Sequence, residues 1–494
     1  MKLNELLRKA GLEELADEAS GECEITGIVS NSRKVKKGNL FVALRGLNFD
    51  GAQYVADAFL RGAAFVISER ELEGKRTLRV ENARAVLARL FDAWYDHPAK
   101  DLALIGVTGT NGKTSVSTML YHILSRAGHR CGLIGTVECR CGEVELRACD
   151  AQGLANMTTP DPEHLYRMLA QMRALGAEYV VMEVTSHALA LDKVAPLFFQ
   201  RAIFTNLSTD HLDFHGDMES YFEEKKKLFR ACEAAVISYS TAYGLRLAQY
   251  LERPFWELSS KTVREIVYHD TGGVSFCLTP QGGGRMALRV GVPGAFTVEN
   301  AGLAALCAYS LGVDERQIKN ALEAFPGVRG RMERICGENT EISVFLDYAH
   351  TPDALEKLLL SARGFAAPHE RIVVLFGCGG ERDKSKRREM GRIASRLADL
   401  VILTSDNARG EDPDAILEQI LSGVDKEKPY AVIKERRHAI AWAIEHARTG
   451  DILLLAGKGH EEYEIRGKSR LPFSERQIVA RCLAARGERK DRAD

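Results

Sequence analysis

The stretch Ile105-Gly-Val-Thr-Gly-Thr-Asn-Gly-Lys-Thr114 joins an apolar run over residues 102–107 to a segment with helical periodicity. We expect it to form a strand, a glycine-rich turn and a helix that begins at Lys113. In such a loop, glycines let backbone N–H groups surround phosphate oxygens, and the helix N-terminus adds positive charge. Lys113 would meet the β- and γ-phosphates, and the Thr114 hydroxyl would reach Mg²⁺. The sequence therefore predicts a nucleotide-binding site.

The glycine spacing of this stretch departs from the standard phosphate loop. The motif Gly-x-x-x-x-Gly-Lys-Ser/Thr requires glycine where this chain has Val107. The loop fits only the shorter form Gly109-Thr-Asn-Gly112-Lys-Thr114. A Gly-Lys-Thr turn also occurs by chance in many proteins, but the strand and helix on either side favour phosphate binding.

Bulk properties narrow the class of protein. A chain of 494 residues is too long for one hydrophobic core, and about three domains are expected. The balance of 67 basic against 68 acidic residues gives no field that favours nucleic acid or a membrane surface. The sequence contains no signal-peptide core and no long apolar run, and its 11 cysteines show no disulfide framework. We expect a cytoplasmic protein with reduced thiols.

Apolar strand-like runs alternate with helix-patterned segments along the chain, which predicts an α/β fold. We expect a small α/β domain at 1–100, a central P-loop domain with a doubly wound, mostly parallel sheet at 101–328, and a second α/β domain at 329–494. Ligands of such sheets bind outside the carboxyl ends of the strands. Expected strands lie at 38–44, 64–67, 102–107, 179–184, 201–205, 343–346, 371–376, 400–404 and 451–456, and expected helices include 161–175 and 221–231.

Two polar segments of the central domain follow predicted strands. They are Glu183-Val-Thr-Ser-His187 and the run from Thr205 to Gly216, which contains His211. A carboxylate and an imidazole at these strand ends would converge with Thr114 on Mg²⁺ beside the phosphates. The alternative is that the aspartates of the second segment cap helices and its histidines are ordinary loop residues. Taken together, and downstream of a phosphate loop, the two segments favour a functional site.

A lysine-rich helix follows. On it Lys225 shares one face with Tyr221, Leu228 and Phe229, whereas Lys226 is expected in solvent. Burial lowers the pKa of a lysine and makes its amine nucleophilic. Spacing alone favours an ordinary lysine over a special role for Lys225.

Polar loops also follow the predicted strands of the third domain, and they carry both signs of charge. Arginine presents a fork that matches carboxylates, while Asp and Glu match ammonium groups. A pocket lined by both would recognise a zwitterion. On spacing alone, exposed loops with surface charges are equally compatible. The charged and amide residues are Arg382, Asp406, Asn407, Arg409 and Glu461.

The order of these motifs resembles the Mur ligases, and among them the MurE type. The likeness covers essentially the whole chain and implies an N-terminal uridine-nucleotide domain and a Rossmann-like C-terminal domain. It rests on Ser30-Asn-Ser32, the Gly109–Thr114 loop, Thr158-Thr159-Pro160, Glu183-Val-Thr-Ser-His187, Asp210-His-Leu-Asp-Phe-His-Gly216, Gly330-Arg-Met-Glu333, Asp347-Tyr-Ala-His-Thr-Pro352 and Gly457-Lys-Gly-His-Glu461.

The resemblance implies an ADP-forming ligase of peptidoglycan synthesis. ATP would phosphorylate the D-glutamate carboxylate of UDP-MurNAc-L-Ala-D-Glu, and the amino group of a third amino acid would displace phosphate from the acyl phosphate. We expect a monomer that uses Mg²⁺. Rival interpretations are a folylpolyglutamate-synthetase-like ligase and, in another class, a nucleotide-switch ATPase that turns over ATP without an acceptor.

The resemblance also assigns residues. Lys113, Glu183, His211 and Lys225 would be catalytic, with Thr114, Glu183, His211 and a carbamate on Lys225 serving the metal. ATP contacts fall on Gly109, Thr110, Asn111, Gly112, Lys113, Thr114, Ser115, Asn300, Arg331, Asp347 and His350. UDP-sugar-peptide contacts fall on Ser30, Ser32, Thr158, Thr159, Thr185 and Lys193, and amino-acid contacts on Arg382, Asp406, Asn407, Ala408, Arg409, Gly457 and Glu461.

The loop Asp406-Asn-Ala408-Arg409 bears on the choice of amino acid. Family members that add meso-diaminopimelate typically show Asp-Asn-Pro-Arg, and lysine-adding members lack the arginine. Diaminopimelate carries a distal carboxylate that Arg409 and Arg382 could bind in a fork. Alanine in place of proline removes backbone stiffness from the loop, so L-lysine stays an alternative.

Overall fold

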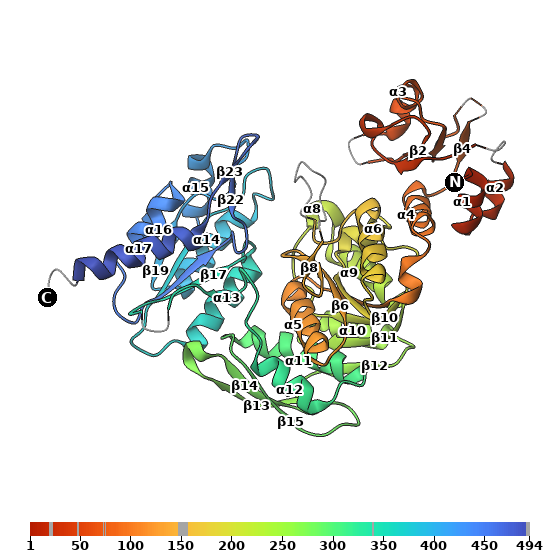
Figure 1. Ribbon diagram of the computed structural model, residues 1–494. Helices are drawn as coiled ribbons and strands as arrows, with labels where there is room; N and C mark the ends of the chain where they lie inside the picture. The colour runs from red at the N-terminus through yellow and green to blue at the C-terminus, as the bar shows by residue number, and fades with distance from the viewer. Residues whose placement is uncertain are drawn as a thin grey trace.

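The computed structural model describes residues 1–18, 23–46, 49–72, 74, 76–146, 157–337 and 340–490, with side chains described except at 17–18 and 487–490. Its largest sheets contain four, eight and six strands, and most of their strands are parallel. Figure 1 shows the N-terminal unit and the C-terminal unit on opposite sides of the central one. The α/β class and the mostly parallel central sheet are confirmed.

The N-terminal unit is a parallel four-stranded sheet in the order β1-β2-β3-β4. Its helices α1 and α4 bury leucines in the same hydrophobic cluster that covers one face of the central sheet. The small unit is therefore packed onto the central one. Its elements are α1 Leu3–Lys9, α2 Glu13–Glu18, β1 Gly27–Val29, η1 Ser32–Lys34, β2 Asn39–Ala43, η2 Gly51–Tyr54, α3 Val55–Leu60, β3 Phe65–Ser68, β4 Thr77–Arg79, α4 Ala83–Trp94 and η3 Pro98–Asp101.

The central sheet has the order β12-β11-β10-β5-β9-β6-β7-β8. Alternate residues of its inner strands enter clusters on opposite faces: Leu104 joins one and Ile105 the other. A strand buried on both faces reads as a continuous apolar run, which is why these strands could be predicted. The elements are β5 Ala103–Thr108, α5 Lys113–Arg126, β6 Cys131–Ile134, β7 Cys139–Cys141, β8 Val144–Glu145, α6 Pro162–Ala174, β9 Tyr179–Glu183, α7 Ser186–Ala190, β10 Phe199–Phe204, α8 Leu212–His215, α9 Met218–Arg230, β11 Cys232–Ser238, α10 Ala242–Tyr250 and β12 Phe255–Leu258.

The strand register brings the polar loops of the central sheet together. Val107 pairs with Glu183 and Thr108 with Phe204, so β5, β9 and β10 end at the same edge. The phosphate loop, the segment after Glu183 and the segment after β10 all leave the sheet there. This is the edge at which ligands of parallel sheets bind.

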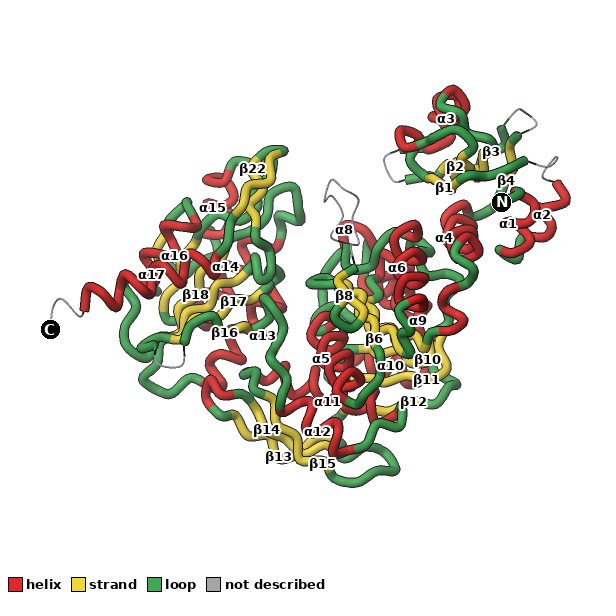
Figure 2. The backbone as a smooth tube through the Cα atoms, in the orientation of Figure 1, coloured by secondary structure: helices red, strands yellow, loops and turns green. Residues whose placement is uncertain are grey.

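A separate three-stranded antiparallel sheet follows β12 and was not predicted. Its inner side chains join the hydrophobic cluster on the face covered by α5 and α11. Figure 2 shows these strands below the central sheet. The elements are β13 Val263–Tyr268, η4 Asp270–Gly272, β14 Val274–Leu278, β15 Met286–Val290, α11 Ala295–Ser310 and α12 Glu315–Glu323.

The C-terminal sheet has the order β16-β17-β21-β18-β19-β20, in which only the pairing of β16 is antiparallel. Asp347 pairs with Ala456 and Phe376 with Leu403, so four loops leave one edge. The elements are β16 Glu333–Arg334, β17 Ser343–Asp347, α13 Pro352–Phe365, β18 Ile372–Phe376, α14 Lys386–Leu397, β19 Leu400–Leu403, α15 Pro413–Leu421, β20 Tyr430–Val432, α16 Arg436–Glu445, β21 Ile452–Ala456, β22 Tyr463–Arg466, β23 Ser469–Pro472 and α17 Glu475–Lys490. Among the described residues, no helix is both long and apolar enough to cross a bilayer.

Candidate active site

The phosphate loop has the backbone that its glycines predict. Gly109 and Gly112 have φ values of 151° and 85°, in the region that favours glycine. A side chain at Gly109 would collide with the Thr205 hydroxyl, and one at Gly112 would meet the Asn300 side chain. The loop therefore fits tightly between β10 and α11, and α5 begins at Lys113 as expected.

The Lys113 ammonium lies inside this loop. Its Nζ donates to the carbonyls of Gly109 and Thr110, each at 2.9 Å. Burial lowers the pKa of Lys113. A cation held within the turn that would surround phosphate oxygens is suited to neutralise them.

Glu183 gathers hydroxyl groups at the edge of the sheet. Its buried carboxylate accepts from Thr114 Oγ1 at 3.1 Å, and from Thr136 through both the backbone N–H at 2.8 Å and Oγ1 at 3.0 Å. Thr136 Oγ1 in turn lies 2.9 Å from Thr158 Oγ1. Oxygen donors clustered in this way match the ligand chemistry that Mg²⁺ prefers.

Two further threonines of the predicted site, Thr159 and Thr185, lie near the end of β9. Thr159 Oγ1 donates to the Glu183 carbonyl at 2.9 Å and lies 3.2 Å from Thr185 Oγ1. Thr185 also caps α7, because its hydroxyl accepts from Ala188 N at 3.2 Å. The structure thus brings Thr158, Thr159 and Thr185 together beside Glu183.

Lys225 lies beneath the phosphate loop. Its side chain is buried, its Nζ donates to the Gly109 carbonyl at 3.0 Å, and it sits 4.6 Å from the centre of the Tyr221 ring. Burial, and next the charge of Lys113, hold the pKa of Lys225 well below its ordinary value. The inward orientation predicted from the helix face is confirmed. The expectation for Lys226 was wrong, because its ammonium packs 4.0 Å from the centre of the Tyr250 ring and only 12% of its side chain is exposed.

His211 stands at the N-terminus of α8 with a left-handed backbone, φ 56°. Its ring centre lies 4.9 Å from that of His187 and its Nε2 lies 3.4 Å from Asp210. The side chain keeps 45% of its surface exposed, but desolvation of the ring at the edge of the cavity lowers the pKa of His211, so the imidazole is neutral near neutral pH. A neutral imidazole can act as a metal ligand. Asp210 and His211 both line the cavity described next.

A cavity of about 310 Å³ lies between the phosphate loop and the C-terminal unit. Residues 110–115 line one side of it, together with Glu183 and Asn300. Arg331, Asp347 and His350 line the other side. The Arg331 guanidinium lies 3.4 Å from Thr114 Oγ1 and 4.4 Å from the centre of the Tyr348 ring. Every predicted ATP residue except Gly109 therefore borders one cavity.

Asp347 contributes to this wall by holding the backbone. Its carboxylate accepts from the N–H groups of Met332 and Ala349, both at 2.8 Å. Burial raises the pKa of Asp347 above its ordinary value. These bonds fix the entry of the chain into the C-terminal unit next to Arg331.

The predicted amino-acid residues converge at the edge of the C-terminal sheet. Asn407 Nδ2 donates to Glu461 Oε2 at 2.8 Å, which joins the loop after β19 to the loop after β21. Arg409 Nη1 donates to the Gly380 carbonyl at 2.7 Å, which adds the loop after β18. Asp406 does not face an open pocket, as a ligand for an ammonium would, because it pairs with Lys458 at 3.2 Å and is buried.

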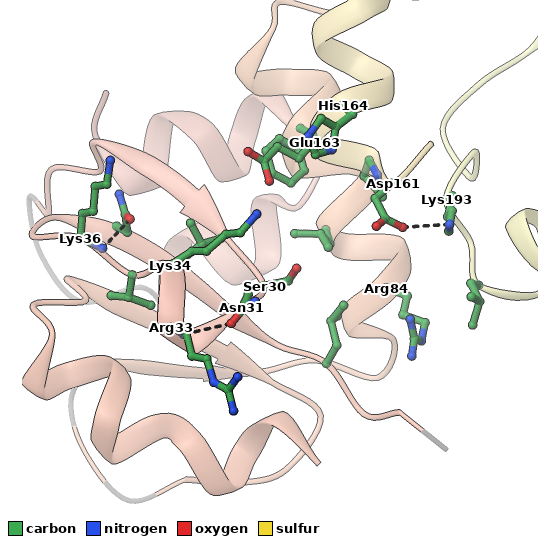
Figure 3. A pocket seen from close by; sticks show the side chains of 18 residues that line it. Ser30, Asn31, Arg33, Lys34, Lys36, Arg84, Asp161, Glu163, His164 and Lys193 are labelled. Carbon is green, nitrogen blue, oxygen red and sulfur yellow. Dashed lines mark hydrogen bonds and ion pairs between the residues drawn. The ribbon is translucent and has the colours of Figure 1, made fainter. Parts of the chain in front are cut away.

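A second cavity, of about 760 Å³, lies between the N-terminal unit and α6 (Figure 3). Ser30 and Lys193 line it, and Lys193 Nζ pairs with Asp161 at 2.8 Å. Ser32 is buried and is not among the lining residues. Basic side chains border the cavity at Arg33, Lys34, Lys36 and Arg84.

Comparisons with known proteins identify this arrangement. The Mur ligase middle domain profile matches residues 107–308, the profile "Mur ligase, glutamate ligase domain" matches 330–459, and the profile "Mur ligase family, catalytic domain" matches 24–95. A UDP-N-acetylmuramoyl-L-alanyl-D-glutamate–2,6-diaminopimelate ligase of Gloeobacter violaceus is 40% identical over 501 residues, which cover 99% of each chain. The chain belongs to the Mur ligase family.

Other relatives agree. A ligase of the same name from Clostridioides difficile is 38% identical over 496 residues, covering 98% of this Mur ligase and 100% of the relative. A solved structure of a UDP-N-acetylmuramoyl-L-alanyl-D-glutamate–2,6-diaminopimelate ligase superimposes with a TM-score of 0.66 at 31% identity, covering 94% of this chain and 95% of that one.

Two residues of the site in this Mur ligase, Thr136 and Asp353, were not predicted from the sequence. Thr136 follows β6, whose end is level with that of β9, so the strand-end rule could have found it. Asp353 joins the two walls of the cavity of about 310 Å³ by accepting from Asn111 Nδ2 at 2.6 Å and from Ser208 Oγ at 2.8 Å. No local pattern distinguishes Asp353 from an ordinary first-turn helix acid.

Proposed function

We propose that this Mur ligase adds meso-diaminopimelate to the D-glutamate carboxylate of UDP-MurNAc-L-Ala-D-Glu, with conversion of ATP to ADP and phosphate. The observation that carries the proposal is the 40% identity to a ligase of that name over 99% of both chains. The phosphate loop faces Arg331 across one cavity, and this supports the proposal because a nucleotide bound there would contact both the central and the C-terminal unit.

We assign the first step to the edge of the central sheet. The γ-phosphoryl group of ATP would pass to the D-glutamate carboxylate, which forms an acyl phosphate and releases ADP. Lys113 and Arg331 would hold the negative charge that moves during transfer, a task of positioning and electrostatics. Thr158, Thr159 and Thr185 would orient the dipeptide carboxylate, since their hydroxyls lie beside Glu183.

The donor set around Glu183 fits Mg²⁺. A buried carboxylate surrounded by the Thr114 and Thr136 hydroxyls offers the hard oxygen ligands that this ion binds, with substrate phosphates completing the shell. When bound, Mg²⁺ would neutralise phosphate charge. His211 borders the same cavity and is the proposed imidazole ligand.

We further propose that Lys225 is carbamylated. Burial favours its neutral amine, which can attack CO₂ and lose a proton to give an N-carboxylate. The product is an anion placed under the phosphate loop, beside the Gly109 carbonyl and the Thr108 hydroxyl.

For the acceptor, Arg409 and Arg382 are the proposed partners of the distal carboxylate of diaminopimelate. A Cβ at Gly379 would lie 3.0 Å from Arg409 Nη1 and 3.9 Å from Arg382 Cγ, so the two arginines flank one glycine. Glu461 and the Gly457 carbonyl would accept from the distal ammonium group. L-Lysine, which lacks the carboxylate, is the alternative acceptor.

We place the uridine nucleotide in the cavity lined by Ser30 and Lys193, where Lys34 and Arg84 add positive charge (Figure 3). The proposed domains are 1–100 for this nucleotide, 101–328 for ATP and 329–494 for the acceptor. We infer that the enzyme acts as a cytoplasmic monomer.

Phosphate release from ATP in the presence of UDP-MurNAc-L-Ala-D-Glu tests the proposal. We expect release with meso-diaminopimelate and little with L-lysine. The Arg409→Ala variant should lose the use of diaminopimelate while still forming the acyl phosphate, which hydroxylamine traps as a hydroxamate. Release with neither amino acid would refute the ligase assignment, whereas a preference for L-lysine would refute only the role of Arg409.

A further inference from the structure

Two loops of this Mur ligase, Asp406–Arg409 and Gly457–Glu461, are proposed to bind the acceptor amino acid. They rest on four buried charged residues that no local sequence pattern singled out as a group. Lys458 and Asp406 lie in the loops themselves, and Arg436 and Glu475 lie beneath them at the first turns of α16 and α17. Lys458 is 0% exposed, Arg436 1% and Glu475 3%. Two acids and two bases give this cluster no net charge.

One guanidinium contacts the start of both loops. Arg436 Nη2 donates to the Ala456 carbonyl at 2.9 Å, and Nη1 lies 3.5 Å from the Ser405 carbonyl. Ser405 immediately precedes Asp406, and Ala456 immediately precedes Gly457. Arg436 therefore ties the ends of β19 and β21 together at the point where the two loops begin.

Glu475 orients that guanidinium. Its Oε1 accepts from Arg436 Nε at 2.8 Å, so the carboxylate occupies the third side of the planar fork. A lysine could not make these three contacts at once, because its ammonium is a single point on a flexible stem. The geometry depends on arginine.

Further out, Lys458 connects the same two loops a second time. Its Nζ donates to Asn407 Oδ1 at 3.1 Å and pairs with Asp406 Oδ1 at 3.2 Å. Burial alone would raise the pKa of Asp406, but the charges of Lys458 and then Arg436 hold it below its ordinary value. The carboxylate is therefore charged and fixed, and Asn407 is held facing Glu461.

We propose that Arg436 and Glu475 are positioning residues that set the spacing of the Asp406–Arg409 and Gly457–Glu461 loops and thereby the geometry of acceptor amino-acid binding. This inference rests on the function proposed above. The pair lies under the loops and is not among the residues that line either of the two cavities described above. A buried ion pair is often no more stabilising than apolar residues of the same volume. What this pair supplies in addition is therefore the contacts of Arg436 with the carbonyls at the start of the two loops.

The inference predicts which half of the reaction depends on the pair. Acyl-phosphate formation takes place at the central sheet and does not involve these loops. Attack by the amino group requires the acceptor to be held in line with the acyl phosphate, and a displacement of about 1 Å can cost about a hundredfold in rate. Loss of the pair should therefore affect the amino-acid step alone.

The variant Arg436→Lys keeps the charge and removes the fork. We expect the KM for the acceptor amino acid to rise about tenfold or more, with the KM values for ATP and UDP-MurNAc-L-Ala-D-Glu within about twofold of the parent enzyme. Hydroxamate formation with hydroxylamine, measured without amino acid, should be unchanged. A general loss of folding would move all of these quantities together.

Two further variants separate positioning from stability. The double variant Arg436→Met/Glu475→Leu removes both charges and leaves neither unpaired, and we expect it to keep the thermal midpoint while still raising the acceptor KM. The matched control is Arg371→Lys. Arg371 makes a bidentate pair with Asp451, at 2.9 and 2.6 Å. This pair lies where β18 and β21 begin, whereas the acceptor loops lie where the strands of the same sheet end. Loss of the bidentate pair should therefore leave the acceptor KM unchanged.

The outcomes distinguish this inference from the function on which it rests. If the parent enzyme forms neither hydroxamate nor an amino-acid adduct, the proposed function fails. If the parent enzyme is active but Arg436→Lys and the double variant leave the acceptor KM unchanged, or raise all three KM values equally, the positioning role is overturned. Unfolding of both variants would also overturn it, because the pair would then be a determinant of folding.

Discussion

Lys225 is the residue whose surroundings constrain its chemistry most narrowly. It is buried under the phosphate loop, and its ammonium form faces the like charge of Lys113. Those conditions favour the neutral amine. The proposed carbamate would then place an anion beside the positive charge of Lys113. Sequence reasoning could place Lys225 inward because a helix face is a local pattern, but only the resemblance suggested the carbamate.

The Lys225→Ala variant should lower turnover by about a hundredfold or more, because the charge that organises the phosphate site is removed. The temperature of thermal unfolding should change little, because the substitution also removes a buried polar group whose desolvation costs stability. Lys227→Ala is the matched control: this lysine lies on the same helix with 40% of its side chain exposed, and activity should be unaffected. In solutions containing ¹³C-bicarbonate, a carbamate signal in the ¹³C NMR spectrum of the parent enzyme should be absent from Lys225→Ala. A spectrum without this signal in the parent enzyme would contradict the carbamate.

At the scale of elements, α13 joins the C-terminal unit to the phosphate loop. Asp353, in its first turn, accepts from Asn111 of the loop and from Ser208 after β10, and Lys357 donates to the same oxygen at 2.9 Å. The helix therefore carries a carboxylate that holds the loop from across the cavity.

Asp353→Ala should raise the KM for ATP by about tenfold, because hydrogen bonds to a charged group contribute ~1.5–3 kcal/mol each and the Asn111 side chain would lose its partner. The KM for the acceptor should stay within about twofold, since its proposed loops are elsewhere. Glu356→Ala, on the same helix but paired with Arg396 at the surface, serves as control. Equal effects of the two substitutions on the KM for ATP would show that α13 contributes only stability.

The elements also show what sequence can predict. Parallel strands buried on both faces are continuous apolar runs, and the expected strands from 102 onward lie within a few residues of β5, β9, β10, β17, β18, β19 and β21. The loops at their ends were found for the same reason. What could not be predicted is which side chains pair over long distances in the sequence: Asn111 and Asp353 are 242 residues apart, and Arg436 and Glu475 are 39 residues apart on two different helices. Partner choice of this kind leaves no periodicity in the chain.

At the scale of the whole molecule, the stability should depend on pH through buried neutral histidines. Burial, and next the charges of Arg331 and Arg329, lower the pKa of His460 from 6.5 to about 4. Between these values the unfolded chain binds a proton that the folded enzyme does not, so acidification favours unfolding. The contribution of His460 is complete above pH 6.5 and is lost as the pH falls toward 4.

The free energy of unfolding, measured with urea at pH 7 and pH 5, should therefore be smaller at pH 5. His460→Gln should show a smaller decrease between the two values than the parent enzyme, because one of the titrating groups is gone. An identical decrease in both proteins would mean that His460 has an ordinary pKa in the folded enzyme.

At the scale of the whole molecule, ATP is proposed to bind at the central sheet and the acceptor at the C-terminal sheet, so ATP would activate a carboxylate. Transfer of ¹⁸O tests this most directly. With ¹⁸O in the D-glutamate carboxylate of UDP-MurNAc-L-Ala-D-Glu, collapse through an acyl phosphate leaves a labelled oxygen on the released phosphate. We predict phosphate carrying one ¹⁸O atom per turnover when meso-diaminopimelate is present. Phosphate free of label, with its new oxygen taken from water, would show that the protein is an ATPase and contradict the ligase mechanism.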